Sequence, residues 1–513
     1  MDLTHISLPI NGGNMGPVCL IIPPSVFLLD ERVFMTLGVL RIAGVLERAG
    51  IEVEVLDLSG ISNYIEAMRD HAIVSKANVF GLTATTPQLP AATDLAATVR
   101  SVRPDARVIL GGPHVTLVNA AFKKEKLHGK LGRATSAMRI LEEKFDVLVA
   151  GDGEEAIFHA CKPDAPNLVD ADDPKSALFL TNAHLNELPF PARHLVDAGS
   201  YHYQIDGRRA YSLIAQLGCP FECGFCGGRA SPMLRKIRTR TSESIVAEML
   251  HMHKTLGCNG FMFYDDELNV NKKVVELMNM IADAQRRLGV EWRLRGFVKA
   301  ELFTETQAEA MYRAGFRWIL VGFESGSARI LDNINKKATR EDNTRCMQIA
   351  HKCGLKVKAL MSIGHPGETI QTVWETRDWL LQVKPEAFDL TIITCYPGTP
   401  YYDEAEPTSD PAIWRYTYQK TKDSLYQVDL DFTQVADYYK GDPDGGYKAY
   451  VFTEGLCRDA LVAVRGEVER EVRKELGIPY DVGAPSLRYE HSMGQGPLPP
   501  NILRASAGTL ASK

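Results

Sequence analysis

The chain has 513 residues, of which 45% are hydrophobic and 24% are charged, a composition typical of a soluble globular enzyme with a large core. At roughly 150 residues per domain, this length predicts about three domains. A net charge of -6 argues against an extended nucleic-acid surface, so we expect no nucleic-acid partner.

Membrane insertion and secretion are not expected either. No apolar stretch approaches the ~18 residues that a membrane-spanning helix needs. The first residues, MDLTHISLPINGG, lack the charged flank and apolar run of a signal peptide. Ten cysteines, most of them isolated on apolar segments, are typical of reduced intracellular thiols. We therefore expect a cytoplasmic enzyme.

The first ~150 residues alternate short apolar runs with helical patterns. Strands are predicted over 18–24, 51–58, 79–86, 106–112 and 145–151. This alternation indicates an α/β domain with a doubly wound, Rossmann-like parallel sheet. Such sheets bind ligands at the carboxyl ends of their strands, where TATTPQ, GGPHVT and GDGEEA occur.

A proline-bearing connector, LNELPFPARHL, follows at 185–195. A second alternating series has six predicted strands, over 211–217, 260–264, 290–297, 317–323, 356–364 and 388–394. Six βα units favour a partial (β/α)6 barrel with its chemistry at the carboxyl ends of the strands. We therefore expect one domain over 1–195 and a barrel over 196–405.

The remaining residues, 406–513, are predicted to form a mainly helical capping region. Residues 447–477 have the pattern of one long amphipathic helix, and the tail over 494–513 is expected to be loosely ordered. The aromatic and acidic segments 429–442 and 488–495 are expected to cap the barrel and shape its pocket.

Three cysteines, Cys219, Cys223 and Cys226, follow the first barrel strand with the spacing C-x3-C-x2-C. A structural zinc site is one interpretation, but it normally has four protein ligands, and the next candidates lie beyond a predicted helix. The other interpretation is a 4Fe-4S cluster held by three thiolates. Electron-transfer clusters usually have four cysteines, so a cluster in this loop would lack one protein ligand. One iron then stays open to an outside ligand.

The spacing, its place after the first strand and the six βα units resemble the radical S-adenosylmethionine (SAM) superfamily. The resemblance implies a 4Fe-4S cluster whose open iron binds SAM. It also implies an external low-potential electron donor of the flavodoxin or ferredoxin type, and a 5′-deoxyadenosyl radical that abstracts a substrate hydrogen.

The same resemblance implies SAM contacts at the ends of later strands. Acidic residues of FYDDELN suit the SAM ammonium group, although Glu267 could instead cap the following helix. Arg295 and Lys299 could pair with a carboxylate of SAM or substrate, or be structural charges. The SAM-binding candidates are Phe225, Asp265, Asp266, Glu267, Arg295, Glu324, Ser325, Gly364 and Tyr396.

The N-terminal domain resembles the cobalamin-binding branch of this superfamily. The cobalamin-binding candidates are Thr83, Thr85, Thr86, Gly111, Gly112, His114, Thr116, Gly151, Asp152, Gly153 and Glu154. The sequence lacks the D-x-H-x-x-G motif of methionine-synthase-type domains, because Asp70 and His71 are adjacent. We therefore expect no histidine on cobalt, and a backbone or cofactor-tail contact for His114. The alternative is a nucleotide-type sheet, but no G-x-G-x-x-G follows the first strand.

These resemblances imply a cobalamin-dependent radical SAM methyltransferase acting on an unactivated carbon of a small molecule. A cyclase or rearrangement enzyme that transfers no methyl group is the alternative within enzymes. A cobalamin- or metal-binding sensor with a structural cluster is the alternative from another class. The sequence specifies neither the substrate nor the oligomeric state.

Overall fold

The structure is a computed structural model that describes residues 15–25, 31–437 and 448–478. The segment expected to be loosely ordered, 494–513, and the acidic segment 488–495 lie outside these ranges. Within them, every helix is too short or too polar to cross a membrane.

The N-terminal domain has a parallel sheet in the strand order β2-β1-β3-β4-β5-β6, so the predicted doubly wound fold is confirmed. A sixth strand, β6, lies beyond the five that were predicted. The strands are β1 (Val18–Ile22), β2 (Val53–Asp57), β3 (Val79–Thr83), β4 (Arg107–Gly111), β5 (Val147–Gly151) and β6 (Leu168–Ala171).

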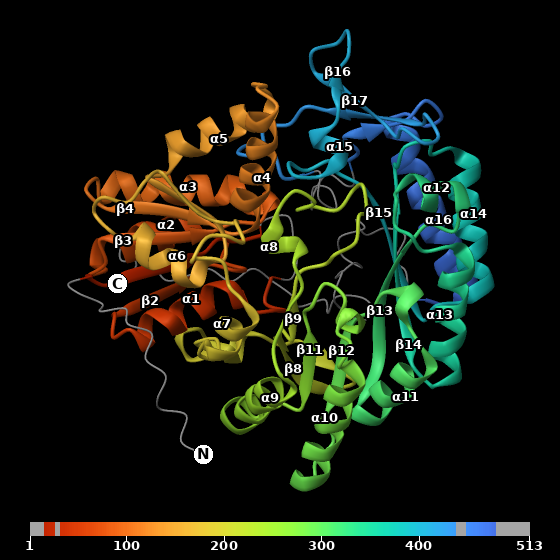
Figure 1. The fold of residues 1–513 in the computed structure, drawn as a ribbon, viewed down its shortest axis with the longest axis horizontal. Helices are drawn as coiled ribbons and strands as arrows, with labels where there is room; N and C mark the ends of the chain where they lie inside the picture. Colours follow the sequence, from red (N-terminus) through yellow and green to blue (C-terminus); the bar gives the residue numbers. More distant parts are fainter. Residues whose placement is uncertain (1–14, 26–30, 438–447, 479–513) are drawn as a thin grey trace.

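Helices cover both faces of this sheet (Figure 1). They are α1 (Leu37–Arg48), α2 (Tyr64–Val74), α3 (Leu89–Val102), α4 (Pro113–Leu127), α5 (Arg133–Lys144) and α6 (Gly153–Ala160). Strand β1, which lies between β2 and β3, is buried on both faces, which explains its continuous apolar sequence VCLII. Cys19 and Ile21 enter one core cluster with Met68 of α2, whereas Leu20 enters another with Val39 of α1.

The second sheet is a curved half-barrel in the order β15-β14-β13-β12-β11-β8-β7. Its six main strands are parallel, and the short β7 pairs antiparallel with β8 at one edge. The strands are β7 (Gln204–Ile205), β8 (Arg208–Leu213), β11 (Gly260–Phe263), β12 (Arg293–Phe297), β13 (Phe316–Glu324), β14 (Lys356–Ile363) and β15 (Ala387–Ile392). The predicted partial barrel is confirmed.

Helices flank the outer side of the half-barrel, drawn green to cyan in Figure 1. They are α9 (Ser242–Leu256), α10 (Val274–Leu288), α11 (Glu305–Ala314), α12 (Ala328–Asn333), α13 (Arg340–Lys352) and α14 (Ile370–Val383). Short elements outside these two sheets are α7 (Asn182–Glu187), β9 (Gln216–Leu217), α8 (Pro232–Arg235) and β10 (Arg238–Thr239).

The first barrel strand ends at Leu213 rather than at 217 as predicted. The reason is the carboxylate of Asp265, which accepts hydrogen bonds from the backbone N–H groups of Ala215 and Gln216. These two amides therefore leave the ladder, and Gln216 and Leu217 form β9, which pairs antiparallel with β10.

The C-terminal region contains a four-stranded antiparallel sheet that the sequence analysis did not predict. Its elements are α15 (Pro400–Asp403), β16 (Glu406–Pro407), β17 (Ile413–Thr417), β18 (Ser424–Val428), β19 (Val451–Phe452) and the helix α16 (Arg458–Leu476). The predicted start of the long helix at 447 is wrong, because Val451 and Phe452 pair with β18 and the helix begins at Arg458.

Helix α16 covers β15, the edge strand of the half-barrel. The Arg465 and Arg473 guanidinium groups donate to the backbone oxygens of Leu390 and Phe388, at 2.7 and 2.9 Å. The Glu469 carboxylate accepts from the backbone N–H of Leu390 at 2.9 Å. An unpaired strand edge is thereby hydrogen-bonded to side chains at successive helix turns.

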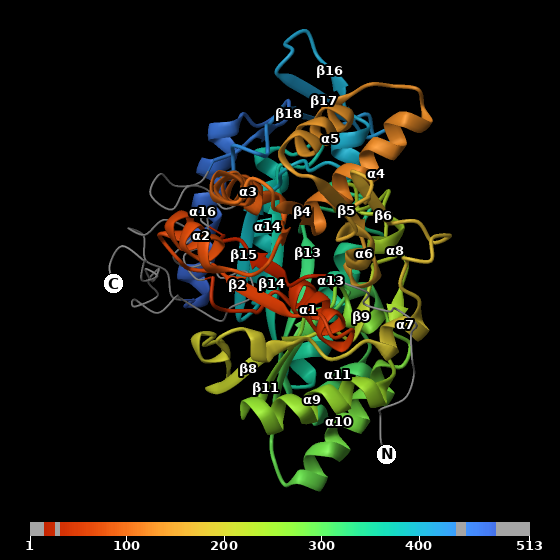
Figure 2. The same ribbon diagram turned by 90° about the vertical axis from the view of Figure 1, so that its left-hand side faces the viewer.

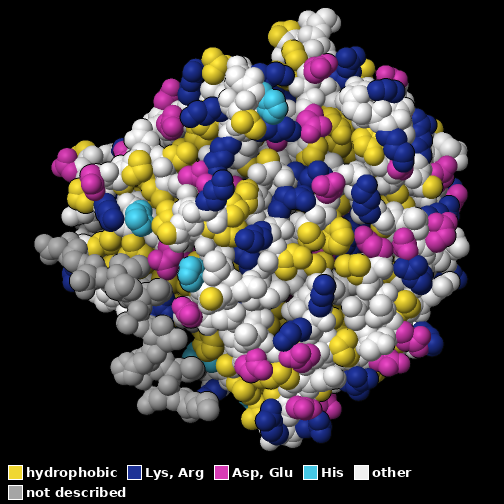
Figure 3. Space-filling view, in the orientation of Figure 1, with side chains coloured by type: hydrophobic (Ala, Val, Ile, Leu, Met, Phe, Trp, Pro, Cys, Tyr) yellow, Lys and Arg dark blue, Asp and Glu magenta, His cyan; other side chains and the backbone are white. Residues whose placement is uncertain are grey.

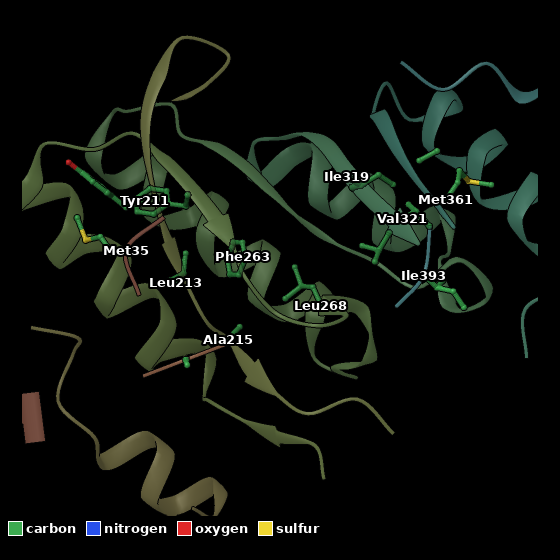
Figure 4. Packing of buried hydrophobic residues seen from close by; sticks show 14 of the residues in the cluster. Met35, Tyr211, Leu213, Ala215, Phe263, Leu268, Ile319, Val321, Met361 and Ile393 are labelled. Atoms are coloured by element: carbon green, nitrogen blue, oxygen red, sulfur yellow. The ribbon is translucent and has the colours of Figure 1, made fainter. Parts of the chain in front are cut away.

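The largest hydrophobic cluster is continuous between the two sheets. It contains Met35 from the N-terminal domain together with Leu213, Phe263 and Val321 of the barrel (Figure 4). On the surface shown in Figure 3, basic and acidic side chains are interspersed. The shared core holds the carboxyl ends of the two sheets near one another.

Candidate active site between the two sheets

The three cysteines lie in the loop between β9 and α8, beyond the carboxyl end of β8. The backbone N–H of Cys219 donates to Leu234 O at 2.9 Å, and that of Cys226 donates to Cys223 O at 3.3 Å. Burial raises the pKa of the Cys219 thiol to about 11. The loop thus folds back on α8 and presents the cysteines from one short segment.

The segment after α12 braces this loop from the barrel side. Gly224 N–H donates to Ile334 O at 2.8 Å, and the Asn335 side-chain amide donates to Glu222 O at 3.0 Å. Burial raises the pKa of the Cys223 thiol, while the ammonium groups of Lys336 and Lys299 act in the opposite direction. These two buried lysines, 4% and 2% exposed, suit a cluster of negatively charged thiolates.

Lys336 was not singled out from the sequence. Its Nζ lies 3.1 Å from Oε1 of Glu324, and both side chains are largely buried. Glu324 ends β13 with φ at 66°, in the left-handed region that non-glycine residues rarely adopt. A strained backbone that carries a buried ion pair is typical of a functional site.

A buried hydrogen-bond chain continues from Glu324. Ser362 Oγ donates to Glu324 Oε2 at 2.8 Å and lies 2.8 Å from His365 Nε2. Because Ser362 has a single proton to donate, His365 carries its proton on Nε2, and Nδ1 faces the Tyr401 hydroxyl at 3.4 Å. Burial lowers the pKa of His365 to about 4, so the ring is neutral at pH 7. Its ring packs against Phe225, with the ring centroids 5.2 Å apart.

The three acidic candidates after β11 differ in their surroundings. Asp265 is buried and its carboxylate is occupied by the Ala215 and Gln216 amides, whereas Asp266 is exposed. The buried Oε2 of Glu267 has no hydrogen-bond partner within the described ranges. Burial raises the pKa of Glu267 to about 7, and Lys336 and Lys299 counteract this rise. Among the described residues, Glu267 therefore has a buried carboxylate oxygen available to a ligand ammonium, whereas the Asp265 carboxylate is already engaged.

The remaining SAM candidates also differ in burial and in their contacts. Arg295 is fully buried and donates to the Tyr203 hydroxyl at 3.2 Å. Ser325 is buried, with its hydroxyl 3.0 Å from Thr376 Oγ1. Gly364 follows β14 with φ at 94°. Tyr396 is half-buried and its ring lies 6.1 Å from that of Phe432.

A cavity of about 410 Å³ opens at the carboxyl ends of the N-terminal strands and extends to the barrel. From the barrel side it is lined by Ile214, Leu217, Met233, Leu234 and Tyr264. The cobalamin candidates that line it are Thr83, Thr85, Gly111, Gly112, Thr116, Gly151, Asp152, Gly153 and Glu154. The structure therefore brings the three N-terminal strand-end motifs, TATTPQ, GGPHVT and GDGEEA, to one cavity that borders the barrel, whereas the three cysteines and the SAM candidates are not among its lining residues.

Two cobalamin candidates, Thr86 and His114, are not among the residues that line this cavity. Both are buried, and His114 Nδ1 lies 3.1 Å from Thr86 Oγ1. Burial lowers the pKa of His114 to about 4, and its ring lies 6.2 Å from that of Phe432. No histidine is found in the cavity lining as far as the chain is described.

Glycine is required at two points of the cavity wall. Gly112 has φ at 96°, and a Cβ there would lie 2.8 Å from Ala84 N. Gly151 has φ at 89°, and a Cβ there would lie 2.7 Å from Ala171 O. Thr116 connects these two turns, because its hydroxyl donates to Gly112 O at 3.1 Å and accepts from Gly151 N–H at 3.0 Å.

An ion pair also connects the cavity wall to the segment that follows the cysteine loop. Asp152, which follows β5, forms a fully buried ion pair with Arg238 of β10. Burial raises the pKa of Asp152 to about 6, and the nearby Glu154 carboxylate contributes to the rise. Glu154 in turn pairs with Arg41 of α1 at 3.3 Å.

Comparison with known protein families identifies both parts. The model of the radical SAM superfamily matches residues 213–380, which include the cysteine loop. The model of the B12 binding domain matches residues 31–142, which include strands β2, β3 and β4 of the first sheet. The chain carries a B12-binding domain followed by a radical SAM domain. The resemblance inferred from the motifs is thus confirmed.

Similar proteins align with this chain over much of their length. An uncharacterized methyltransferase of Pyrococcus horikoshii is 26% identical over 392 residues, covering 76% of this chain and 83% of the relative. An anaerobic magnesium-protoporphyrin IX monomethyl ester cyclase of Rubrivivax gelatinosus is 25% identical over 386 residues, covering 70% of this chain and 64% of the cyclase.

Solved structures show the same fold. The radical S-adenosylmethionine methyltransferase TsrM from Kitasatospora setae, with cobalamin and a 4Fe-4S cluster bound, superposes with a TM-score of 0.58 at 17% identity. The match covers 79% of this chain and 81% of TsrM. The cobalamin-dependent S-adenosylmethionine radical enzyme OxsB superposes with a TM-score of 0.53 at 15% identity, covering 72% of this chain and 52% of OxsB.

The described residues fit the cofactors that the two domains imply. Three cysteines in one loop beside two buried ammonium groups suit a 4Fe-4S cluster. The Glu267 oxygen, which has no hydrogen-bond partner in the described part of the chain, suits the ammonium group of SAM. The glycine-lined wall offers bare backbone and side-chain oxygens to cobalamin where the B12-binding domain meets the radical SAM domain.

Proposed function

We propose that this protein is a cobalamin-dependent radical SAM methyltransferase that methylates an unactivated carbon of a small molecule. The observation that carries the proposal is the cavity shared by the two domains, because it joins the glycine-rich strand ends to the strand ends beside the cysteine loop. When bound, the cluster and SAM supply a radical that removes a hydrogen atom, and cobalamin carries the methyl group.

In this proposal the residues of the chain have distinct roles. Cys219, Cys223 and Cys226 hold the cluster, and Glu267 accepts the SAM ammonium. Lys336 balances negative charge near Cys223 and orients the Glu324 carboxylate through their ion pair. Phe225, Gly364 and Tyr396 bound the same site. In this proposal SAM, cobalamin and the substrate are held next to one another, so the reacting groups need not meet by diffusion.

On the cobalamin side, the proposed contacts are polar groups and bare backbone. Thr83, Thr85 and Glu154 offer side-chain oxygens along the wall, while Gly111 and Gly153 expose peptide groups. Asp152 is assigned a positioning role, because its carboxylate is bound to Arg238 and to the Leu180 amide. We further propose an external flavodoxin- or ferredoxin-type donor and a cytoplasmic location.

A second candidate function is a cyclase without methyl transfer, favoured by the similarity to the magnesium-protoporphyrin ester cyclase. Methyl transfer consumes SAM in two ways and yields both S-adenosylhomocysteine and 5′-deoxyadenosine. A cyclase yields 5′-deoxyadenosine alone. The two functions therefore differ in a quantity that can be measured before the substrate is known.

The experiment uses anaerobically reconstituted protein with cobalamin, SAM and a strong reductant. We expect about four irons per chain and both nucleoside products, with Cys219→Ala, Cys223→Ala or Cys226→Ala abolishing 5′-deoxyadenosine. The buried thiols Cys258 and Cys346 provide controls, and their alanine variants should keep activity. Formation of 5′-deoxyadenosine without S-adenosylhomocysteine would favour the cyclase. Full iron content without any SAM cleavage would favour a sensor.

A further inference from the structure

A second group of potential metal ligands lies on the opposite face of the first sheet from the cavity. Cys19 of β1 and Glu54 of β2 are register partners on adjacent parallel strands, so their side chains project from the same face. His71 lies on α2, one helix position before the buried Ala72, which packs in the same core cluster as Cys19. Leu20, the next residue along β1, lines the cavity on the other side.

The three side chains converge on one point. Cys19 Sγ lies 3.5 Å from His71 Nε2, which lies 2.9 Å from Glu54 Oε2. All three ligand atoms fall within 4.8 Å of one another. A tetrahedral zinc ion with bonds of about 2.3 Å to sulfur and about 2.0–2.1 Å to nitrogen separates these two atoms by about 3.5 Å. The sulfur and nitrogen therefore already have the spacing of two zinc ligands.

The surroundings hold the carboxylate in place. Ser75 Oγ donates to Glu54 Oε2 at 2.7 Å, and the backbone N–H of Lys76 donates to Glu54 Oε1 at 3.3 Å. Outer contacts of this kind orient the ligands of metal sites. Cys19 is fully buried, whereas the side chains of His71 and Glu54 are 27% and 23% exposed. Water can thus reach the outer side of the group.

We propose that Cys19, Glu54 and His71 bind one Zn²⁺ ion, with water as the fourth ligand. A thiolate, an imidazole and a carboxylate form a ligand set that suits Zn²⁺ and disfavours Mg²⁺ or Ca²⁺. The thiol proton of Cys19 passes to solvent when the metal binds, because only the thiolate is a ligand. The ion would cross-link β1, β2 and α2, and it would be separate from the cluster and from cobalamin.

The test is a Co²⁺ titration of the full-length chain in which Cys219, Cys223 and Cys226 are replaced by alanine, so that the cluster loop cannot bind metal. We expect one equivalent of Co²⁺ with a near-ultraviolet thiolate-to-cobalt charge-transfer band, displaced by Zn²⁺. Cys19→Ser should abolish the band, and Ser75→Ala should weaken binding by roughly 10- to 100-fold. Cys161→Ser is the matched control, because Cys161 is a buried thiol in the other core cluster.

A band that persists in Cys19→Ser, or the absence of any thiolate band in the parent chain, would overturn the proposal. If the triple alanine background does not fold, elemental analysis of the reconstituted wild-type protein decides instead. We expect about one zinc per chain in addition to iron, lost in Cys19→Ser and in His71→Gln with iron content unchanged. Equal zinc in wild type and Cys19→Ser would contradict the assignment.

Discussion

Lys336 Nζ lies 3.1 Å from Glu324 Oε1 in a buried ion pair whose ammonium group also acts on the thiol of Cys223. The two residues reach the site from different elements, Glu324 from the end of β13 and Lys336 from the loop after α12. The pair therefore connects the strand end to the segment that braces the cysteine loop.

Replacing Lys336 by methionine should lower the free energy of unfolding by about 3–5 kcal/mol, because it leaves the Glu324 carboxylate buried without its counter-ion. Urea denaturation measures this change. In the double variant Glu324→Gln and Lys336→Met, the Glu324 charge is removed together with its counter-ion, so much of the stability should return. If the single and double variants lose the same free energy of unfolding, the loss does not come from an uncompensated Glu324 charge.

Glu267→Gln should weaken SAM binding by about 10- to 150-fold, because a hydrogen bond to a charged group contributes about 1.5–3 kcal/mol. Isothermal titration of the reconstituted protein measures the affinity. Asp265→Ala should instead reduce stability by about 1–3 kcal/mol for each backbone amide left unpaired. Unchanged SAM affinity in Glu267→Gln would remove this carboxylate from the SAM site.

Asp152→Asn should destabilise the protein by about 3–5 kcal/mol, because it leaves the Arg238 guanidinium buried without its counter-ion. We also expect loss of cobalamin during gel filtration, since Asp152 lines the cavity. Asp170→Asn is the control, because its ion pair with Lys123 is partly exposed and should contribute at most about 1 kcal/mol. If the two substitutions change stability and cobalamin retention to the same extent, the buried ion pair of Asp152 has no particular importance for either property.

His365 should make stability fall as the pH is lowered from about 6.5 to 4. Its folded pKa of about 4 lies below the ordinary value of 6.5, so the unfolded chain binds the proton more tightly. The contribution is complete above pH 6.5, and about 2 kcal/mol of it is lost at pH 5. Urea midpoints at pH 7.5 and 5 should differ less in His365→Gln than in wild type. The same pH dependence in both proteins would contradict this assignment.

The lower face of cobalt is expected to carry no protein nitrogen. The cavity lining contains no histidine over the described residues, and His114 is hydrogen-bonded to Thr86. Electron paramagnetic resonance of the protein loaded with cob(II)alamin should therefore show cobalt lines without nitrogen splitting. Threefold splitting that disappears in His114→Ala would identify His114 as a ligand after all.

Much of the architecture follows from local patterns. The alternation of buried strands and amphipathic helices predicted both sheets, because hydrophobic periodicity depends on neighbouring residues alone. The spacing of Cys219, Cys223 and Cys226 predicted the cluster loop for the same reason. The short strands β16 to β19 escaped prediction, because two to five residues are too few to establish a period.

Only the tertiary structure decided which residues share a site. Asp265 and Glu267 look equivalent in FYDDELN. The bend after β8, however, engages Asp265 with two amides, whereas an oxygen of Glu267 has no partner among the residues that the structure describes. Lys336 is placed beside Glu324 by the packing of the loop after α12, and Cys19 meets Glu54 and His71 through strand register. These contacts join residues far apart in the chain, so no local pattern encodes them.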